Sequence, residues 1–172
     1  DYYAADIKKI SGMETEYTLM YKGKALGKIN LHVAGVHNIL NSLAAAAASF
    51  YANVSFESIQ KGLSDFRGAG RRFELIGKEK GITIVDDYAH HPTELSVTLK
   101  AAMDMGYNKV WAVFQPFTFS RTAILLDDFA KALSIPDNAV LTDIMGSREK
   151  NTYNIYTRNL AEKIDGCIYF PQ

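Results

Sequence analysis

The sequence has a single cysteine, Cys167, among its 172 residues, so an internal disulfide is excluded. It also has no excess charge, because 19 lysines and arginines balance 19 aspartates and glutamates. A general electrostatic attraction to nucleic acid or to an anionic membrane is therefore not expected. No apolar stretch approaches the roughly 18 residues of a membrane span, and no signal peptide is evident. These absences predict a cytoplasmic protein that binds neither nucleic acid nor membrane.

What the sequence does contain is typical of a globular protein: 48% of its residues are hydrophobic, enough for a sizeable core. The chain begins at Asp1 and not at a methionine. We therefore expect it to be a segment of a longer protein, whose function needs residues outside this sequence.

A small, flexible stretch at residues 67–70 separates two differently patterned regions and is the expected linker. Upstream of it, residues 17–20 and 27–33 flank a Lys-Gly-Lys turn and predict a β-hairpin or meander. Two helices should follow, an alanine-rich one over 37–51 and a second one capped by Ser55.

Downstream of the linker, strands and helices alternate after an opening hairpin at 72–76 and 82–85. Such alternation is typical of right-handed βαβ units and predicts an α/β fold with a mostly parallel sheet. The expected helices are 92–105, 122–133 and 158–164, the last capped by Thr157, and the expected strands are 110–114, 139–144 and 168–170.

Three of the expected strands end in polar residues: Asp86 with Asp87, Gln115, and Asp143. A parallel sheet would place these strand ends along one edge, where open α/β sheets bind ligands. The sequence therefore predicts one cleft shared by separate loops.

Asn38 and Asn41 lie three residues apart at the start of the alanine-rich helix, so one ligand could touch both. A side-chain amide matches the N6 and N7 edge of adenine. The alternative is that Asn38 caps the helix and Asn41 is simply solvated.

Arg71 and Arg72 bring two guanidiniums to the start of a strand. An arginine there can bind phosphate oxygens and stabilise charge that develops during phosphoryl transfer. The alternative is a surface salt bridge to Glu74 or Asp65.

Residues 86–94, Asp-Asp-Tyr-Ala-His-His-Pro-Thr-Glu, gather carboxylates, a phenol and imidazoles where a strand meets a helix. A metal site is disfavoured, because adjacent histidines rarely aim both rings at one ion. Asp87 is better interpreted as an acceptor for ribose hydroxyls or as a partner that orients His90. His91 would then cap the following helix, and the Glu94 carboxylate would be stabilised by the positive N-terminal end of the helix dipole.

In the 114–122 stretch, Arg121 lies at the start of a helix, where a substrate carboxylate would be favoured. The alternative is that Ser120 or Thr122 caps this helix and Arg121 is solvated. The charges near Asp143 could equally form a solvated turn.

Taken together, these motifs resemble the later part of a Mur ligase. The resemblance covers essentially the whole chain, in the order 35–38 with 41, 71–74, 86–94, 114–116 with 120–122, and 143–144. The double-histidine form of the 86–94 loop favours the branch of the family that joins L-alanine to UDP-N-acetylmuramate.

The resemblance implies an ATP-dependent, three-domain enzyme of bacterial peptidoglycan synthesis. Residues 1–69 would be the C-terminal portion of its central ATPase domain, which has a P-loop-type fold. Residues 70–172 would be most of a Rossmann-like C-terminal domain. In this family ATP phosphorylates the muramyl carboxylate, and the amine of the amino acid attacks the acyl phosphate, releasing phosphate alongside ADP.

Residue by residue, the resemblance implies that Asn38 and Asn41 contact adenine, Arg72 the ATP phosphates and Asp87 the ribose. Tyr88 would bind both nucleotide and substrate. His90, His91 and Arg121 would bind substrate, with Arg121 near the carboxylate of the amino acid. The implied catalytic residues are Arg72, Asp87 and His90.

Two departures from the family pattern limit what this chain does alone. It contains no G-x-x-x-x-G-K-[ST] sequence, and the Mg²⁺ ligands of the family are expected mainly upstream of it. Phe117 also stands where the family usually has histidine. Two alternatives therefore stay open, a folylpolyglutamate-type amide ligase and a non-catalytic nucleotide-binding module, although the double histidine argues against the first.

We predict that the isolated chain binds ATP weakly or not at all, because it keeps the adenine, ribose and arginine contacts without a phosphate cradle. Isothermal titration calorimetry measures this directly. Submicromolar affinity would contradict the assignment of the nucleotide contacts.

Overall fold

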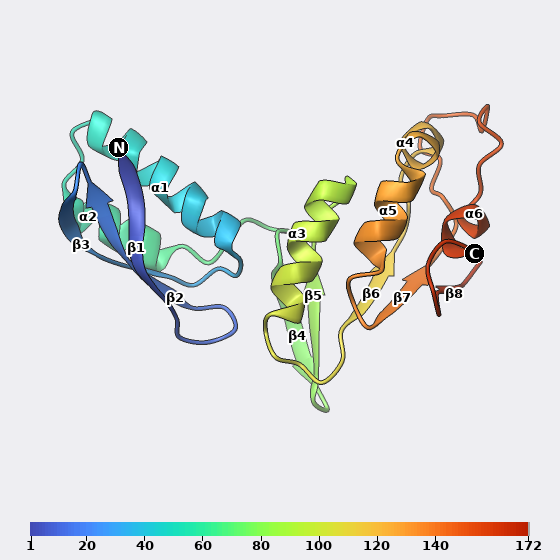
Figure 1. Ribbon diagram of the computed structural model, residues 1–172, viewed down its shortest axis with the longest axis horizontal. Helices are drawn as coiled ribbons and strands as arrows, with labels where there is room; N and C mark the ends of the chain where they lie inside the picture. Colours follow the sequence, from blue (N-terminus) through green and yellow to red (C-terminus); the bar gives the residue numbers. More distant parts are fainter. Residues whose placement is uncertain (172) are drawn as a thin grey trace. The chain divides into compact units, whose positions relative to one another are not determined.

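The hydrophobic side chains of this protein gather in two separate cores, and each belongs to one part of the chain. The computed structural model describes residues 1–171, and its contacts divide the chain into Asp1–Asp87 and Tyr88–Gln172. We call these the first and the second unit and describe each by itself (Figure 1).

The first unit begins with an antiparallel sheet in the order β1-β2-β3. Its strands are β1 (Tyr2–Lys9), β2 (Thr15–Tyr21) and β3 (Lys24–Leu31). The predicted hairpin is confirmed as β2 and β3. Strand β1 was not predicted, because it is mostly exposed, lacks a regular apolar alternation and carries a bulge between Ala5 and Lys8.

Two helices follow in the first unit, α1 (Val36–Tyr51) and α2 (Phe56–Asp65), as predicted (Figure 1). The predicted cap is confirmed, since the Ser55 hydroxyl accepts a hydrogen bond from the Ser58 amide at 3.3 Å. Helix α2 packs closely on β3: a Cβ at Gly27 would lie 2.4 Å from the Phe56 ring, so only glycine fits there.

A buried polar contact ties α1 to the sheet. The Tyr17 hydroxyl on β2 is hydrogen-bonded to the Ser42 hydroxyl on α1 at 2.7 Å, and Tyr17 is fully buried. Burial raises the pKa of Tyr17. The neutral phenol therefore satisfies its polar atom inside the core.

The first unit ends in a hairpin of β4 (Glu74–Glu79) and β5 (Ile82–Asp86), which confirms that predicted element. However, β5 pairs with β4 and is not a strand of the parallel sheet. The prediction that all three polar strand ends lie along one sheet edge was therefore wrong for Asp86 and Asp87.

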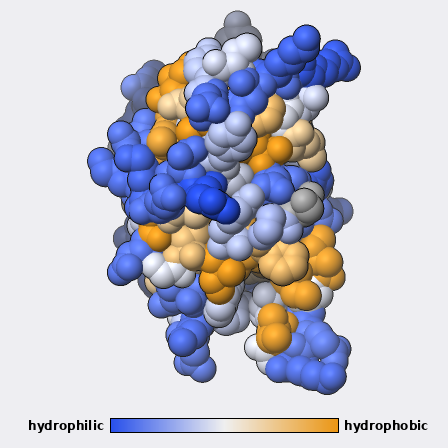
Figure 2. All heavy atoms as spheres, turned by 90° about the vertical axis from the view of Figure 1, so that its right-hand side faces the viewer, coloured by the Kyte–Doolittle hydropathy of each residue, from blue (hydrophilic) through white to orange (hydrophobic). Residues whose placement is uncertain are grey.

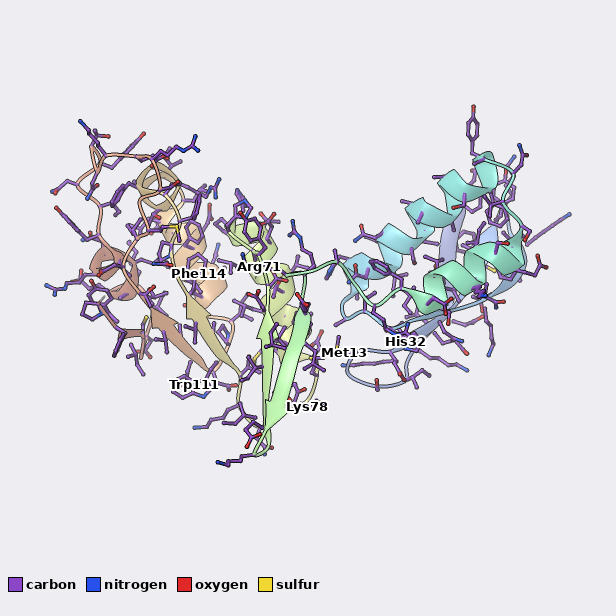
Figure 3. The ribbon with its side chains drawn as sticks, turned by 180° about the vertical axis from the view of Figure 1, so that it is seen from behind. Met13, His32, Arg71, Lys78, Trp111 and Phe114 are labelled. Carbon is purple, nitrogen blue, oxygen red and sulfur yellow. The ribbon has the colours of Figure 1, made fainter. Side chains whose placement is uncertain are left out.

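The second unit contains the predicted parallel sheet, formed by β6 (Trp111–Phe114), β7 (Asn138–Leu141) and β8 (Ile168–Tyr169). The chain is thus an α/β protein. Alternate residues of the sheet, such as Phe114 and Leu141, join a core with helices α3 (Pro92–Met103) and α5 (Leu126–Leu133). Figure 3 shows Trp111 and Phe114 at opposite ends of β6.

Two helices of the second unit differ from the prediction. The segment expected as one helix over 122–133 is two, α4 (Phe119–Ile124) and α5, which meet at Leu125. No glycine or proline marks this break. Helix α6 (Thr157–Ala161) begins after Tyr156, and Thr157 is not its cap, because the Thr157 hydroxyl donates to the Thr142 carbonyl at 2.9 Å.

On the other face of the parallel sheet, the β6 side chains are exposed, Val113 at 74% and Trp111 at 53%, whereas those of β7 are partly buried. Figure 2 shows hydrophobic side chains lying among hydrophilic ones on one side of the molecule. Within residues 1–171, no helix is long and apolar enough to cross a membrane.

We predict that Leu141→Ala lowers the free energy of unfolding by about 2–5 kcal/mol, because it opens a cavity in the core of the second unit. Val113→Ala, on the exposed side of the same sheet, should cost less than about 1 kcal/mol. Urea unfolding followed by the fluorescence of Trp111, the single tryptophan, measures both. Equal losses would mean that the two faces of the sheet are packed alike.

Candidate functional site

The two asparagines at the start of α1 are linked to each other. The Asn41 side-chain amide donates to the Asn38 side-chain oxygen at 3.2 Å, and Asn38 donates to the Ala34 carbonyl at 2.7 Å. The helix cap is Gly35, with φ at 93°, so the alternative that Asn38 caps α1 is wrong. Each side-chain amide has two N–H groups and uses one of them in these bonds, so each retains one for a ligand.

A strained turn carries the two arginines. Arg71 has φ at 55° and Phe73 at 51°, a region that bulky residues rarely occupy. Arg71 donates from Nε to the Asp86 carboxylate at 2.9 Å, and its amide donates to Glu74 at 2.7 Å. The Arg71 side chain thus forms an ion pair with Asp86, a partner that the sequence analysis did not name.

Arg72, between these two strained residues, is exposed. Its amide donates to the Ala69 carbonyl at 3.1 Å. Over residues 1–171 the structure gives its guanidinium no hydrogen bond or ion pair. This side chain is therefore available to an anion such as a phosphate.

Asp87 holds this turn in place. Its carboxylate accepts a hydrogen bond from the Phe73 amide at 2.8 Å. Asp87 also lies near enough to His37 on α1 to act on that imidazole. Burial lowers the pKa of His37, and the Asp87 charge opposes this shift. The beginning of α1 and the end of the hairpin therefore share one neighbourhood in the first unit.

The first unit also has an open cavity of about 530 Å³ near the linker. Phe73 and Glu74 line it, together with Glu14 and His32, which approach each other to 3.3 Å. Figure 3 shows Met13, another lining residue, and His32. None of Asn38, Asn41, Arg72 and Asp87 lines this cavity.

In the second unit, the His90 ring is held by its neighbours. Nδ1 lies 2.9 Å from the Tyr88 carbonyl, and because a carbonyl only accepts, Nδ1 is the donor. The neutral ring then carries its lone pair on Nε2. The Tyr88 ring packs edge-on against it at 5.3 Å, and Glu94 accepts from the His90 amide at 3.0 Å.

His91 caps α3, as one interpretation of the sequence predicted. Its Nδ1 accepts a hydrogen bond from the Thr93 amide at 3.3 Å, and Pro92 occupies the first turn. The cap accounts for His91 without a ligand. Its assignment as a substrate-binding residue stays a prediction.

Arg121 lies in the first turn of α4 and donates from Nη1 to the His90 carbonyl at 3.2 Å. The helix cap is Thr118, so neither Ser120 nor Thr122 caps α4 as the alternative supposed. The Ser120 amide and hydroxyl both donate to Glu149, at 2.9 and 2.6 Å. Tyr88, His90 and Arg121 are thus brought together within the second unit.

The ends of β6 and β7 lie side by side, as the parallel sheet predicts. The Gln115 side chain donates to the Asp143 carbonyl at 3.1 Å. The Asp143 carboxylate accepts a hydrogen bond from the Tyr169 hydroxyl, and this bond raises the pKa of Tyr169.

Over residues 1–171, no three His, Cys, Asp or Glu side chains gather as a metal site requires. The described residues of the first unit fit parts of a nucleotide, because the linked asparagines offer amide edges and Arg72 offers an unengaged guanidinium.

The sequence analysis assigned no site role to three residues that have partners in or beside these sites: His37, Glu149 and Tyr169. His37 directly precedes Asn38, and this position was the available signal. Glu149 contacts Ser120, 29 positions away, and Tyr169 contacts Asp143, 26 positions away. A local sequence pattern does not predict contacts over such separations.

Comparison with known proteins identifies the family. The profile described as "Mur ligase, glutamate ligase domain" matches residues 71–170. The UDP-N-acetylmuramate–L-alanine ligase of Acetivibrio thermocellus is 47% identical over 159 residues, which are 90% of this chain and 34% of that protein. The ligase of the same name from Lachnospira eligens is 45% identical over 172 residues, 98% of this chain and 38% of that protein.

The solved structures agree with the sequences. A crystal structure of a UDP-N-acetylmuramate–alanine ligase from Thermotoga maritima aligns with a TM-score of 0.79 at 26% identity, covering 99% of this chain and 37% of that one. This chain therefore spans little more than a third of the length of these relatives. The profile match over more than half of its residues shows that the chain belongs to the Mur ligase family.

Proposed function

We propose that this chain is the later part of an ADP-forming ligase that joins L-alanine to UDP-N-acetylmuramate in the bacterial cytoplasm. The observation that carries the proposal is the 47% identity, over nine tenths of the chain, to a bacterial ligase named for these two substrates. The whole reaction needs residues beyond this third of the enzyme.

We assign residues 1–69 to the central ATPase domain and 70–172 to the C-terminal domain. The family profile begins at residue 71 and supports this boundary. By contacts alone, the hairpin of β4 and β5 groups with the first unit, and the division falls after Asp87. The hairpin thus belongs to the C-terminal domain by the family profile and to the first unit by its contacts.

ATP supplies the phosphoryl group that activates the muramyl carboxylate, and this chain contributes to binding it. Asn38 and Asn41 are assigned to the adenine, because their amides are already held side by side. Asp87 is assigned to the ribose. Arg72 is assigned to the phosphates, since its guanidinium is exposed next to a turn that Asp87 fixes.

The second unit is assigned to the other substrates. Arg121 would bind the carboxylate of L-alanine, and the His90 ring, fixed by Tyr88, would lie at the reacting centre. Tyr88 and His91 are further substrate-binding candidates. Positioning of the amine against the activated carboxyl group is the main contribution of such residues.

The proposal predicts that the complete ligase containing this chain releases phosphate from ATP only when UDP-N-acetylmuramate and L-alanine are both present. A coupled phosphate assay with each substrate omitted in turn measures this. Robust turnover with glutamate in place of alanine would move the protein to another branch of the family. ATP binding without turnover on any amino acid would support the non-catalytic module.

We further predict that Arg72→Ala lowers kcat by about 100-fold, because one group that stabilises transferring phosphoryl charge is lost. Lys78→Ala is the matched control, since Lys78 is an exposed cation on β4, the strand that follows Arg72 (Figure 3). The control should retain kcat within about twofold of the parent. Equal kcat for the parent and Arg72→Ala would refute the assignment of Arg72.

A further inference from the structure

In the second unit, the loop after β7 is fastened to the loop after β6. Besides the bond from Gln115 to the Asp143 carbonyl, the Met145 amide donates to the Pro116 carbonyl at 2.9 Å. One side-chain and one backbone hydrogen bond thus hold the two loops together, at Asp143 and at Met145.

Gly146, the next residue of the loop after β7, packs against Phe119. Its φ is +75°, and a Cβ added there would lie 2.8 Å from the Phe119 ring, so the backbone passes directly against the first residue of α4. Only glycine meets both requirements without a shift.

Glu149 follows in the same loop and binds the turn that carries Arg121. One of its oxygens accepts from the Ser120 amide at 2.9 Å and the other from the Ser120 hydroxyl at 2.6 Å. These two bonds, with the Ser120 hydroxyl as the larger influence, lower the pKa of Glu149, and the charge of Arg121 adds to the effect. The carboxylate is therefore ionised and held in place at neutral pH.

Arg121 is consequently held at both ends. Its backbone follows Ser120, which Glu149 fixes, and its guanidinium donates to the His90 carbonyl. A long side chain with a fixed backbone and a tethered tip loses less conformational freedom when it binds a ligand.

We propose that Glu149 is a positioning residue for the amino-acid substrate: by binding Ser120 it fixes the turn that aims Arg121 at the carboxylate of L-alanine. The inference rests on the proposed function, which assigns Arg121 to that carboxylate. The role assigned to Glu149 is indirect, because each of its oxygens accepts a hydrogen bond from Ser120.

The test is steady-state kinetics of the complete ligase with Glu149→Gln, which removes the charge and one of the two acceptors. We expect KM for L-alanine to rise about tenfold, while kcat and KM for ATP stay within about twofold. Ser120→Ala removes only the hydroxyl bond and should raise KM for L-alanine by about threefold. Glu162→Gln is the matched control, because Glu162 is an exposed glutamate at the end of α6. It should leave kcat, KM for L-alanine and KM for ATP unchanged.

An unchanged KM for L-alanine in Glu149→Gln, or an equal rise in KM for ATP, would overturn the inference. If Glu149→Gln does not fold, Ser120→Ala decides by the same criterion. If the unmodified ligase shows no alanine-dependent turnover, the proposed function fails instead. Amide hydrogen exchange at residues 118–121 then decides separately, since faster exchange in Glu149→Gln supports a fixed turn and unchanged exchange refutes it.

Discussion

The hydrogen bond from the Phe73 amide to the Asp87 carboxylate holds together the part of the first unit on which the candidate nucleotide site depends. Arg71 and Phe73 both have positive φ, which costs about 1–3 kcal/mol at each bulky residue. A hydrogen bond to a charged group contributes about 1.5–3 kcal/mol, the same order as that strain. Without it the turn would be free to relax, and Arg72, which lies between the two strained residues, would change direction. The carboxylate that the family resemblance assigns to a ribose therefore has a structural role as well.

In the second unit, hydrogen bonds between connecting segments fix the candidate substrate residues. Its candidate substrate residues lie on the loop after β5 and in the short helix α4 that follows β6, and such connecting segments are intrinsically more mobile than strands. Hydrogen bonds between loops replace the rigidity that the sheet cannot provide: Tyr88 holds the His90 ring, His90 holds the tip of Arg121, and Glu149 holds the turn before it. In both units a carboxylate accepts a hydrogen bond from the backbone amide of a residue next to an arginine: Phe73 follows Arg72, and Ser120 precedes Arg121.

The sequence predicted the elements whose signals are local. The Ser55 cap, the hairpin of β4 and β5 and the parallel strands β6 to β8 follow from spacing, turn residues and apolar runs. Strand β1 was missed because an exposed edge strand needs no apolar alternation, and the break at Leu125 was missed because no helix-breaking residue marks it. The family motifs identified Asn38, Asn41, Arg72, Asp87, Tyr88, His90, His91 and Arg121 as candidates. They did not show that Asp87 binds the Phe73 amide or that Glu149 binds Ser120, because such contacts join residues 14 and 29 positions apart.

We propose that Asp87, besides its assignment to the ribose, supports ATP binding mainly by holding the turn that presents Arg72. A double-mutant cycle with Asp87→Asn and Arg72→Ala, read as kcat/KM for ATP in the complete ligase, tests it most directly. If Asp87 works by positioning Arg72, the double variant is no slower than the slower single variant. If the losses of the two single variants multiply, the residues act independently and the claim is contradicted.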